Sequence, residues 1–146
     1  MKLVIDIETV AIEENEFSES QREFILREAL KIEDENLRSK KEDESIRLMS
    51  LFPFTGKIIS IGLMSVDRQS IYVMYEDNEQ NEWFSKEMNC KFKSMSESQM
   101  LSCFWKYVNK CNHLISFNGR NFDLPFLMLR SSILEIKPSR NFLKSR

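Results

Sequence analysis

Short apolar runs separated by polar turns predict strands at four places in the chain. Residues 2–7 (KLVIDI) form a brief run rich in β-branched residues, which favours a buried strand over a helix. Two further runs, at 57–66 (KIISIGLMSV) and 70–76 (SIYVMYE), are separated by the polar turn 67–69. This arrangement predicts an antiparallel hairpin. The run HLISF at 113–117 predicts a fourth strand.

Helical spacing dominates the segment between the first strand and the hairpin. Residues 11–52 contain no Gly or Pro and are rich in Glu, Arg and Lys. Their apolar positions predict a helix over about 18–33, with Ser18 or Ser20 at its N-cap. We expect a mobile charged segment around 38–45.

Two more helices are predicted in the second half of the chain. Apolar residues at i, i+3, i+4 spacing over 100–111 predict a helix that faces the core, and Ser94 with Glu97 fits a capping box before it. After the fourth strand, Asn121 is expected to cap a last helix that carries Pro125 in its first turn.

Length and composition bound the function. The 146 residues are 42% hydrophobic and 30% charged, which is ordinary for one soluble domain, so we expect a single domain over 1–146 with a charged helical insertion at about 11–52. No apolar run approaches the roughly 20 residues of a membrane helix. Three cysteines without C-x-x-C spacing argue against a disulfide framework and against a zinc finger, and we expect a cytoplasmic location.

Charge is distributed unevenly along the chain. Residues 90–146 hold ten Lys/Arg against three acids, a net charge of +7, whereas residues 1–89 carry −9. A basic half can bind a polyanion such as nucleic acid. A solvated surface with uneven charge explains the same numbers, and charge alone leaves both interpretations open.

The first strand carries two acids where its pattern is otherwise apolar. Asp6 and Glu8 are two residues apart, so their side chains point to the same side of the strand. Adjacent carboxylates repel each other, and a hard divalent cation would offset this repulsion. A solvent-exposed strand end that tolerates both charges is the alternative.

A second polar cluster follows the fourth strand. The segment 118–123 (NGRNFD) places Asp123 in the first turn of the last helix, where an acid also stabilises the helix dipole. That structural role does not explain why other polar residues crowd the same turn. Brought together, Asp6, Glu8 and Asp123 would form a three-carboxylate cluster at the ends of two neighbouring strands. Such clusters hold two Mg²⁺ or Mn²⁺ ions about 3.5–4 Å apart.

These motifs resemble those of a known superfamily. Residues 6–9 (DIET) resemble the first motif of the DEDD (DnaQ-like) 3′–5′ exonucleases, and residues 118–123 are similar to the second. Residues 55–63 (TGKIISIGL) and 116–127 (SFNGRNFDLPFL) resemble the branch related to the exonuclease domain of family B DNA polymerases. The three motifs in this order are highly specific.

The resemblance implies a role for each motif residue. Asp6 would bridge two metal ions, Glu8 would bind the catalytic one, and Asp123 would hold the second. The residues that would contact the substrate are Thr9, Asn118 and Phe122. Two ions, Mg²⁺ or Mn²⁺, are the implied cofactors.

The resemblance also implies a fold and a reaction. The fold is RNase H-like, an α/β architecture with a mixed sheet in which three strands are antiparallel and a fourth lies parallel beside the first, through a right-handed crossover. The reaction is metal-assisted attack of water on the last phosphodiester, which removes nucleotides from the 3′ end of a single strand, with DNA favoured over RNA.

The sequence departs from the superfamily pattern near its end. A third motif, a Tyr or His before a fourth Asp, is not present before Arg146, so we expect a C-terminally incomplete sheet and weak or absent activity of these 146 residues. Neither Glu135 nor His113 replaces this motif. About 12 residues of helix would separate Glu135 from Asp123 by roughly 18 Å. We interpret His113 as a structural or surface residue. The alternative function is a non-catalytic module that keeps the fold and binds nucleic acid or a protein. An incomplete sheet edge also favours self-association.

Overall fold

The computed structural model describes residues 1–142, and the chain divides into two compact units. One unit comprises residues 1–8 together with the chain from Ile58 onward, and the other is Thr9–Lys57. The second unit contains the whole of the expected insertion at about 11–52. Whether the whole chain acts as a single domain stays a prediction.

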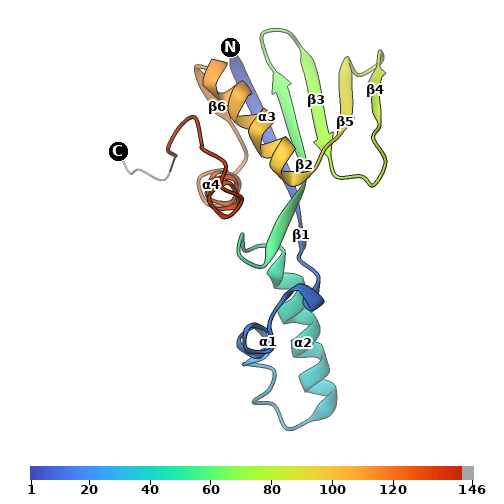
Figure 1. The fold of residues 1–146 in the computed structure, drawn as a ribbon, viewed down its shortest axis with the longest axis vertical. Coiled ribbons are helices and arrows are strands. Elements are labelled where there is room, and N and C mark those ends of the chain that lie inside the picture. The colour runs from blue at the N-terminus through green and yellow to red at the C-terminus, as the bar shows by residue number, and fades with distance from the viewer. Residues whose placement is uncertain (143–146) are drawn as a thin grey trace. The chain divides into compact units, whose positions relative to one another are not determined.

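A mixed sheet forms the centre of the first unit. Within the described residues it has six strands in the order β4-β5-β3-β2-β1-β6 (Figure 1). The strands are β1 (Lys2–Ala11), β2 (Gly56–Ser65), β3 (Ser70–Tyr75), β4 (Glu82–Ser85), β5 (Cys90–Ser94) and β6 (His113–Ile115).

The pairing of the predicted strands is confirmed. β2 and β3 pair antiparallel, with Ile61 opposite Met74. The Val66 amide donates to the Lys2 carbonyl, which sets the end of β2 beside the start of β1, as in an antiparallel pair. β6 pairs parallel with β1, with Leu114 opposite Leu3. Three antiparallel strands and a parallel one beside the first are the arrangement of the RNase H-like fold.

No element was predicted between residues 76 and 94, and the structure has two strands there. β4 and β5 form an antiparallel hairpin that extends the sheet, with β5 parallel to β3. Both strands are short: β4 (EWFS) has only two apolar residues, and β5 (CKFKS) alternates lysine with Phe92, so neither holds an apolar run. The hairpin is held by cross-strand pairs, including Trp83 stacked on Phe92 at 3.8 Å between ring centroids.

The helix expected over about 18–33 is shorter than predicted, and the segment expected to be mobile is helical. The second unit holds the 3-10 turn η1 (Glu14–Glu16), α1 (Glu19–Leu26) and α2 (Glu35–Met49). Ser18 caps α1 as predicted, in a capping box with Gln21. Asp34 caps α2, and this cap and the Lys41–Glu44 pair stabilise a helix that buries only Met49.

The two remaining helices have the predicted positions but different caps. α3 (Glu97–Lys110) begins after Ser96, whose capping-box partner is Gln99, so the pairing of Ser94 with Glu97 was wrong by two residues. α4 (Asp123–Ile133) begins after Phe122 without a side-chain cap, and Asn121 does not cap it. In Figure 1, α3 lies across β1 and β2.

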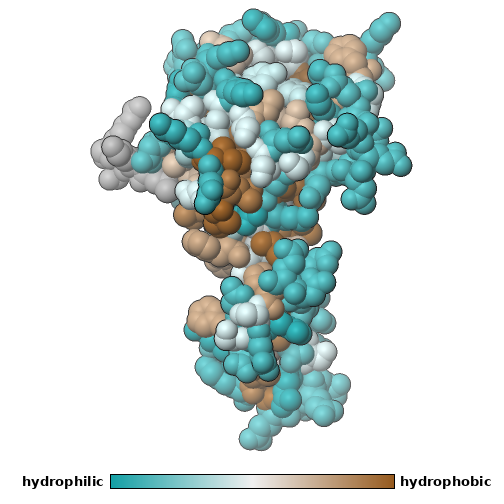
Figure 2. All heavy atoms as spheres, viewed as in Figure 1, coloured by the Kyte–Doolittle hydropathy of each residue, from teal (hydrophilic) through white to brown (hydrophobic). Residues whose placement is uncertain are grey.

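The core lies between the sheet and the two helices of the first unit. It includes Leu3, Ile5, Ile61, Phe104 and Leu127, each at most 2% exposed. Apolar side chains also gather over α4 at the surface (Figure 2). None of the helices in the described part of the chain is long and apolar enough to cross a membrane.

Candidate active site

Asp6 and Glu8 lie on the solvent side of β1. Their side chains are exposed, whereas Ile5 before Asp6 and Ile7 between the two acids are buried against the core. The alternation of the strand therefore presents both acids on one face, as predicted from their spacing. This face of the sheet is opposite to the one that packs against α3.

The loop between β6 and α4 is built around a close approach at Gly119. A Cβ at this position would lie 1.7 Å from the Ser116 hydroxyl oxygen and 2.7 Å from its Cβ. Any side chain would therefore displace Ser116 and the turn. The same hypothetical Cβ would lie 3.6 Å from Oδ2 of Asp123, so the carboxylate rests against the glycine. The glycine lets the acid sit close to the loop backbone.

Asp123 is a buried acid beside another acid. Its side chain is at the first position of α4, and the residue is only 4% exposed. Burial raises the pKa of Asp123, and the negative charge of Asp6 raises it further. The backbone amides of Asp123 itself and of Ile7 act in the opposite direction. The fold thus brings the two acids from β1 and α4 close enough to interact.

An acid pair of this kind fits a hard divalent cation. Carboxylate oxygens are the ligands that Mg²⁺ and Mn²⁺ prefer. A bound cation would offset the cost of burying the charged carboxylate of Asp123 and its repulsion from Asp6. No group of three or more His, Cys, Asp or Glu side chains within residues 1–142 is arranged to hold a metal ion. Glu8 is therefore not gathered with the other two into a three-ligand cluster. Its role as a ligand stays a prediction.

The polar residues expected to contact substrate make local hydrogen bonds. The Thr9 hydroxyl donates to the Ser50 carbonyl at 2.8 Å within the second unit. Asn118 has a positive φ of 51°, a conformation that Asn tolerates, and its Oδ1 accepts from Asn121 Nδ2 at 2.8 Å. The Asn118 carbonyl also accepts the Asn121 amide. Asn118 therefore closes the turn before α4 and remains exposed to solvent.

The two phenylalanines of the loop have different surroundings. Phe122 packs on Phe126, with ring centroids 5.5 Å apart, and belongs to the edge of the core. Phe117, one residue before Asn118, is 95% exposed. A fully exposed ring beside a candidate site is suited to stack on a base. Sequence reasoning missed Phe117 because its run reads as an ordinary strand, and β6 ends two residues before it.

A buried ion pair fixes α4, which carries Asp123. Arg130 donates to both carboxylate oxygens of Glu97, from Nε at 2.8 Å and from an Nη at 2.6 Å. Glu97 Oε1 also accepts the backbone amide of Ile58 at 2.9 Å. Arg130 lies seven residues, about two turns, after Asp123, so α4, α3 and β2 are joined two turns from the acid. A second buried bond runs from Trp105 Nε1 to Ser131 Oγ at 2.8 Å.

Comparison with protein families identifies the second half of the chain. A family described as a predicted 3′–5′ exonuclease related to the exonuclease domain of PolB matches residues 54–146, more than half of the chain. The chain belongs to this family. The match to this PolB-related exonuclease family includes Asp123 and the loop before it, whereas Asp6, Glu8 and Thr9 precede its first matched residue. No match was found among curated proteins.

Proposed function

We propose that this protein is a divalent-metal-dependent 3′–5′ exonuclease acting on the 3′ end of a single-stranded nucleic acid, with DNA favoured. The observation that carries the proposal is the acid pair. Asp123 is buried at the start of α4 and its pKa is raised partly by the charge of Asp6. Membership of the PolB-related exonuclease family supports the reaction class.

The proposed chemistry is hydrolysis of the terminal phosphodiester. A water oxygen bonds to phosphorus, the bond from phosphorus to the 3′ oxygen of the preceding nucleotide breaks, and a nucleoside monophosphate leaves. A bound divalent ion supplies charge to stabilise the phosphate and lowers the pKa of water. Asp6 and Glu8, on the same face of β1, would hold this catalytic ion, and Asp6 and Asp123 would hold a second one.

The other residues of the site would hold the strand. Asn118 is exposed at the turn before α4, and Phe122, packed on Phe126 at the start of that helix, is the second proposed substrate contact. Thr9 follows Glu8 directly in β1 and is proposed to contact the terminal nucleotide, in keeping with the motif. The exposed ring of Phe117 adds a stacking surface.

The test is a gel assay with a 5′-labelled single strand and Mn²⁺. We expect at most weak shortening of the strand from its 3′ end, and we expect this shortening to disappear in Asp6→Ala and in Asp123→Asn. Asp43→Asn is the matched control, because it neutralises an exposed acid of α2 outside the site. A ladder of equal rate in Asp6→Ala would contradict the site assignment.

A non-catalytic module is the second candidate function. It is favoured by the observation that residues 1–142 do not gather three ligands. An intact strand after long incubation with Mn²⁺, together with measurable binding of that strand, would establish this alternative.

Self-association through the outer edge of β6 is also proposed, and a dimer in sedimentation at micromolar concentration would support it.

A further inference from the structure

Basic and aromatic side chains gather in the first unit on the side of the sheet that carries α3. In Figure 1, β3, β5 and β4 extend beyond the strands that α3 crosses. Two grooves, of about 900 and 220 Å³, follow each other along α3 and the neighbouring β5. We name them together the α3 trough. Its cationic and tyrosine residues are Arg68, Tyr72, Lys91, Lys93, Lys106 and Tyr107.

The α3 trough is separate from the candidate active site. Tyr72 pairs with Leu63 on β2 and with Lys91 on β5, so these three side chains share one face of the sheet. Leu63 is 2% exposed in the core under α3, which identifies that face. Asp6 points to the opposite face of β1. A ligand in the trough would therefore not displace one at Asp6.

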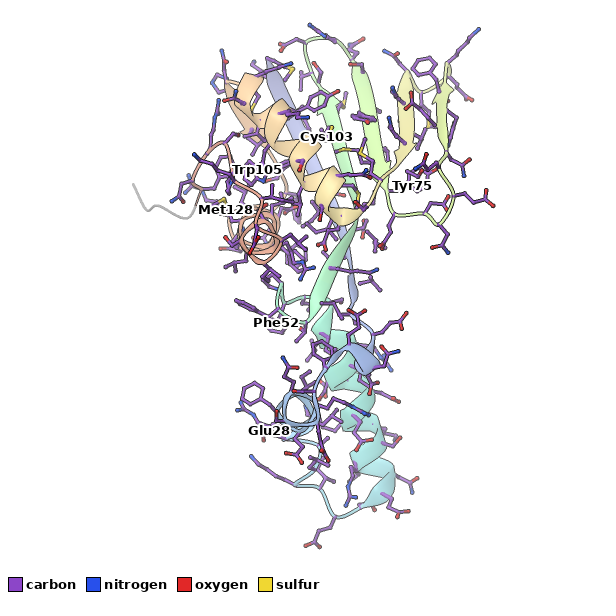
Figure 3. The ribbon with its side chains drawn as sticks, in the orientation of Figure 1. Glu28, Phe52, Tyr75, Cys103, Trp105 and Met128 are labelled. Carbon is purple, nitrogen blue, oxygen red and sulfur yellow. The ribbon has the colours of Figure 1, made fainter. Side chains whose placement is uncertain are left out.

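Four cations line the trough together with two acids, Asp77 and the ion-paired Glu82. Burial raises the pKa of the Cys103 thiol on α3, which Figure 3 labels, while the charges of Lys106, Lys93 and Lys91 oppose that effect. These three lysines therefore lie near Cys103. Arg68 lines the smaller groove. Glu82 pairs with Lys91 at 2.7 Å and with Lys93 at 2.9 Å. The positive charge exceeds the negative, and the trough suits a polyanion.

The aromatic residues narrow the class of polyanion. The rings of Tyr72 and Tyr107 lie 5.9 Å apart with an interplanar angle of 49°, and Lys91 Nζ lies 5.9 Å from the Tyr72 ring centroid. Phe84, which lines the same groove, is 54% exposed. Cationic side chains that alternate with partly exposed aromatic rings suit a polymer that has both phosphates and flat bases. An acidic polypeptide would use the charges and leave the rings without a matched partner.

We propose that the α3 trough binds single-stranded nucleic acid, with phosphates on its lysines and bases against Tyr72 and Tyr107. The inference takes its ligand class from the proposed exonuclease function and adds a binding surface on the other side of the sheet. A strand held there would remain attached to the protein while its 3′ end enters or leaves the candidate active site. The trough itself needs no metal ion.

The test is the anisotropy of a fluorescein-labelled oligo(dT) titrated with the full chain in EDTA, which prevents cleavage. We expect Lys91→Ala/Lys106→Ala to weaken binding and to reduce the slope of log K against log salt by about 1.4, since each phosphate contact with a single strand contributes about 0.7. Lys31→Ala/Lys40→Ala removes the same charge from the second unit and is the matched control. It should leave affinity and slope unchanged.

Three further variants test the rings and the acid Glu82. Tyr107→Leu should weaken binding about fivefold or more, whereas Tyr107→Phe, which keeps the ring, should bind as the unmodified protein does. Glu82→Gln releases Lys91 and Lys93 from their acid partner, so it should tighten binding and steepen the salt dependence. Circular dichroism of each variant verifies that the fold is intact.

The results separate the trough from the active site. Unchanged affinity in Lys91→Ala/Lys106→Ala overturns the inference, and so does competition by polyglutamate as effective as that by unlabelled oligo(dT), which would identify an acidic protein as the ligand. Asp6→Ala should retain oligonucleotide binding in EDTA. Loss of binding in the trough variants without any nuclease activity would uphold the trough and refute the exonuclease proposal. Nuclease activity together with oligonucleotide binding that the trough variants do not weaken would uphold the exonuclease proposal and refute the trough.

Discussion

Two buried acids of the same unit, Glu97 and Asp123, are treated in opposite ways by the fold. Glu97 is 9% exposed, and both its oxygens accept hydrogen bonds from Arg130. Asp123 is 4% exposed, and its charged neighbour is the acid Asp6. The first acid is neutralised within the chain, whereas the second is left beside a like charge. This difference marks Glu97 as a structural residue and is the reason why we propose Asp123 as a metal ligand.

The largest expected effect comes from breaking the neutralised pair. Arg130→Leu leaves Glu97 buried without its partner, and we expect the free energy of unfolding to fall by about 3–5 kcal/mol. Urea denaturation measures this change. The double variant Glu97→Gln/Arg130→Met should recover much of the loss, because Gln still accepts the Ile58 amide. A loss under about 1 kcal/mol for Arg130→Leu would show that the pair does not hold α4.

The corresponding change at the other acid should have the opposite sign for stability. The raised pKa of the Asp123 carboxyl group means that its charged form is unfavourable in the folded protein. Asp123→Asn removes this charge, so the metal-free protein should become more stable while its nuclease activity is lost. A gain of about 1 kcal/mol corresponds to a rise in Tm of roughly 2–4 °C for a chain of this size. Differential scanning fluorimetry in EDTA measures it. A lower Tm for Asp123→Asn would contradict the idea that this charge is unfavourable.

The pH dependence of stability tests whether the charge of Asp123 is unfavourable in the folded protein. Because the pKa of Asp123 is raised in the folded state, its ionisation costs stability as pH rises through that pKa. The stability of the unmodified protein relative to Asp123→Asn should therefore increase as pH falls from 7 through the pKa of Asp123. Tm measured for both proteins across this range tests it. Parallel pH curves would place Asp123 in an environment that does not disfavour its charge.

The smallest expected effects distinguish the two phenylalanines beside Asp123. Phe117→Ala should leave the free energy of unfolding within about 0.5 kcal/mol of the unmodified value, because the ring is 95% exposed, and it should raise KM for a single strand. Phe122→Ala removes a ring packed on Phe126 and should cost roughly 1–3 kcal/mol. Denaturation and steady-state kinetics of both variants check this. An unchanged KM in Phe117→Ala would exclude stacking on that ring.

The sequence predicted the elements that bury an apolar face and missed those that do not. β1, the β2–β3 hairpin and α3 each contribute buried residues at a regular period, so the sequence pattern is sufficient to predict them. α2 depends on its Asp34 cap and local ion pairs, and β4 exposes most of its side chains, so neither has a pattern of apolar residues. Their formation depends on interactions that periodicity does not record.

The candidate site was predicted in part for a similar reason. The position of Asp6 followed from the alternation of a strand, and Asp123 from its place after the fourth strand. The bond between Glu97 and Arg130 joins residues 33 apart, each of which reads as an ordinary surface charge on a helix. The exposure of Phe117 depends on where β6 ends, and sequence patterns define element ends poorly.

The most direct measurement is Mn²⁺ binding by isothermal titration calorimetry to the unmodified chain, Asp6→Ala and Asp123→Asn. The account predicts a Mn²⁺ site that is lost in both variants and retained in Asp43→Asn. It also predicts that Mn²⁺ raises the Tm of the unmodified chain more than that of Asp123→Asn. Mn²⁺ affinity that survives unchanged in Asp6→Ala or Asp123→Asn would show that the acid pair is not a metal site.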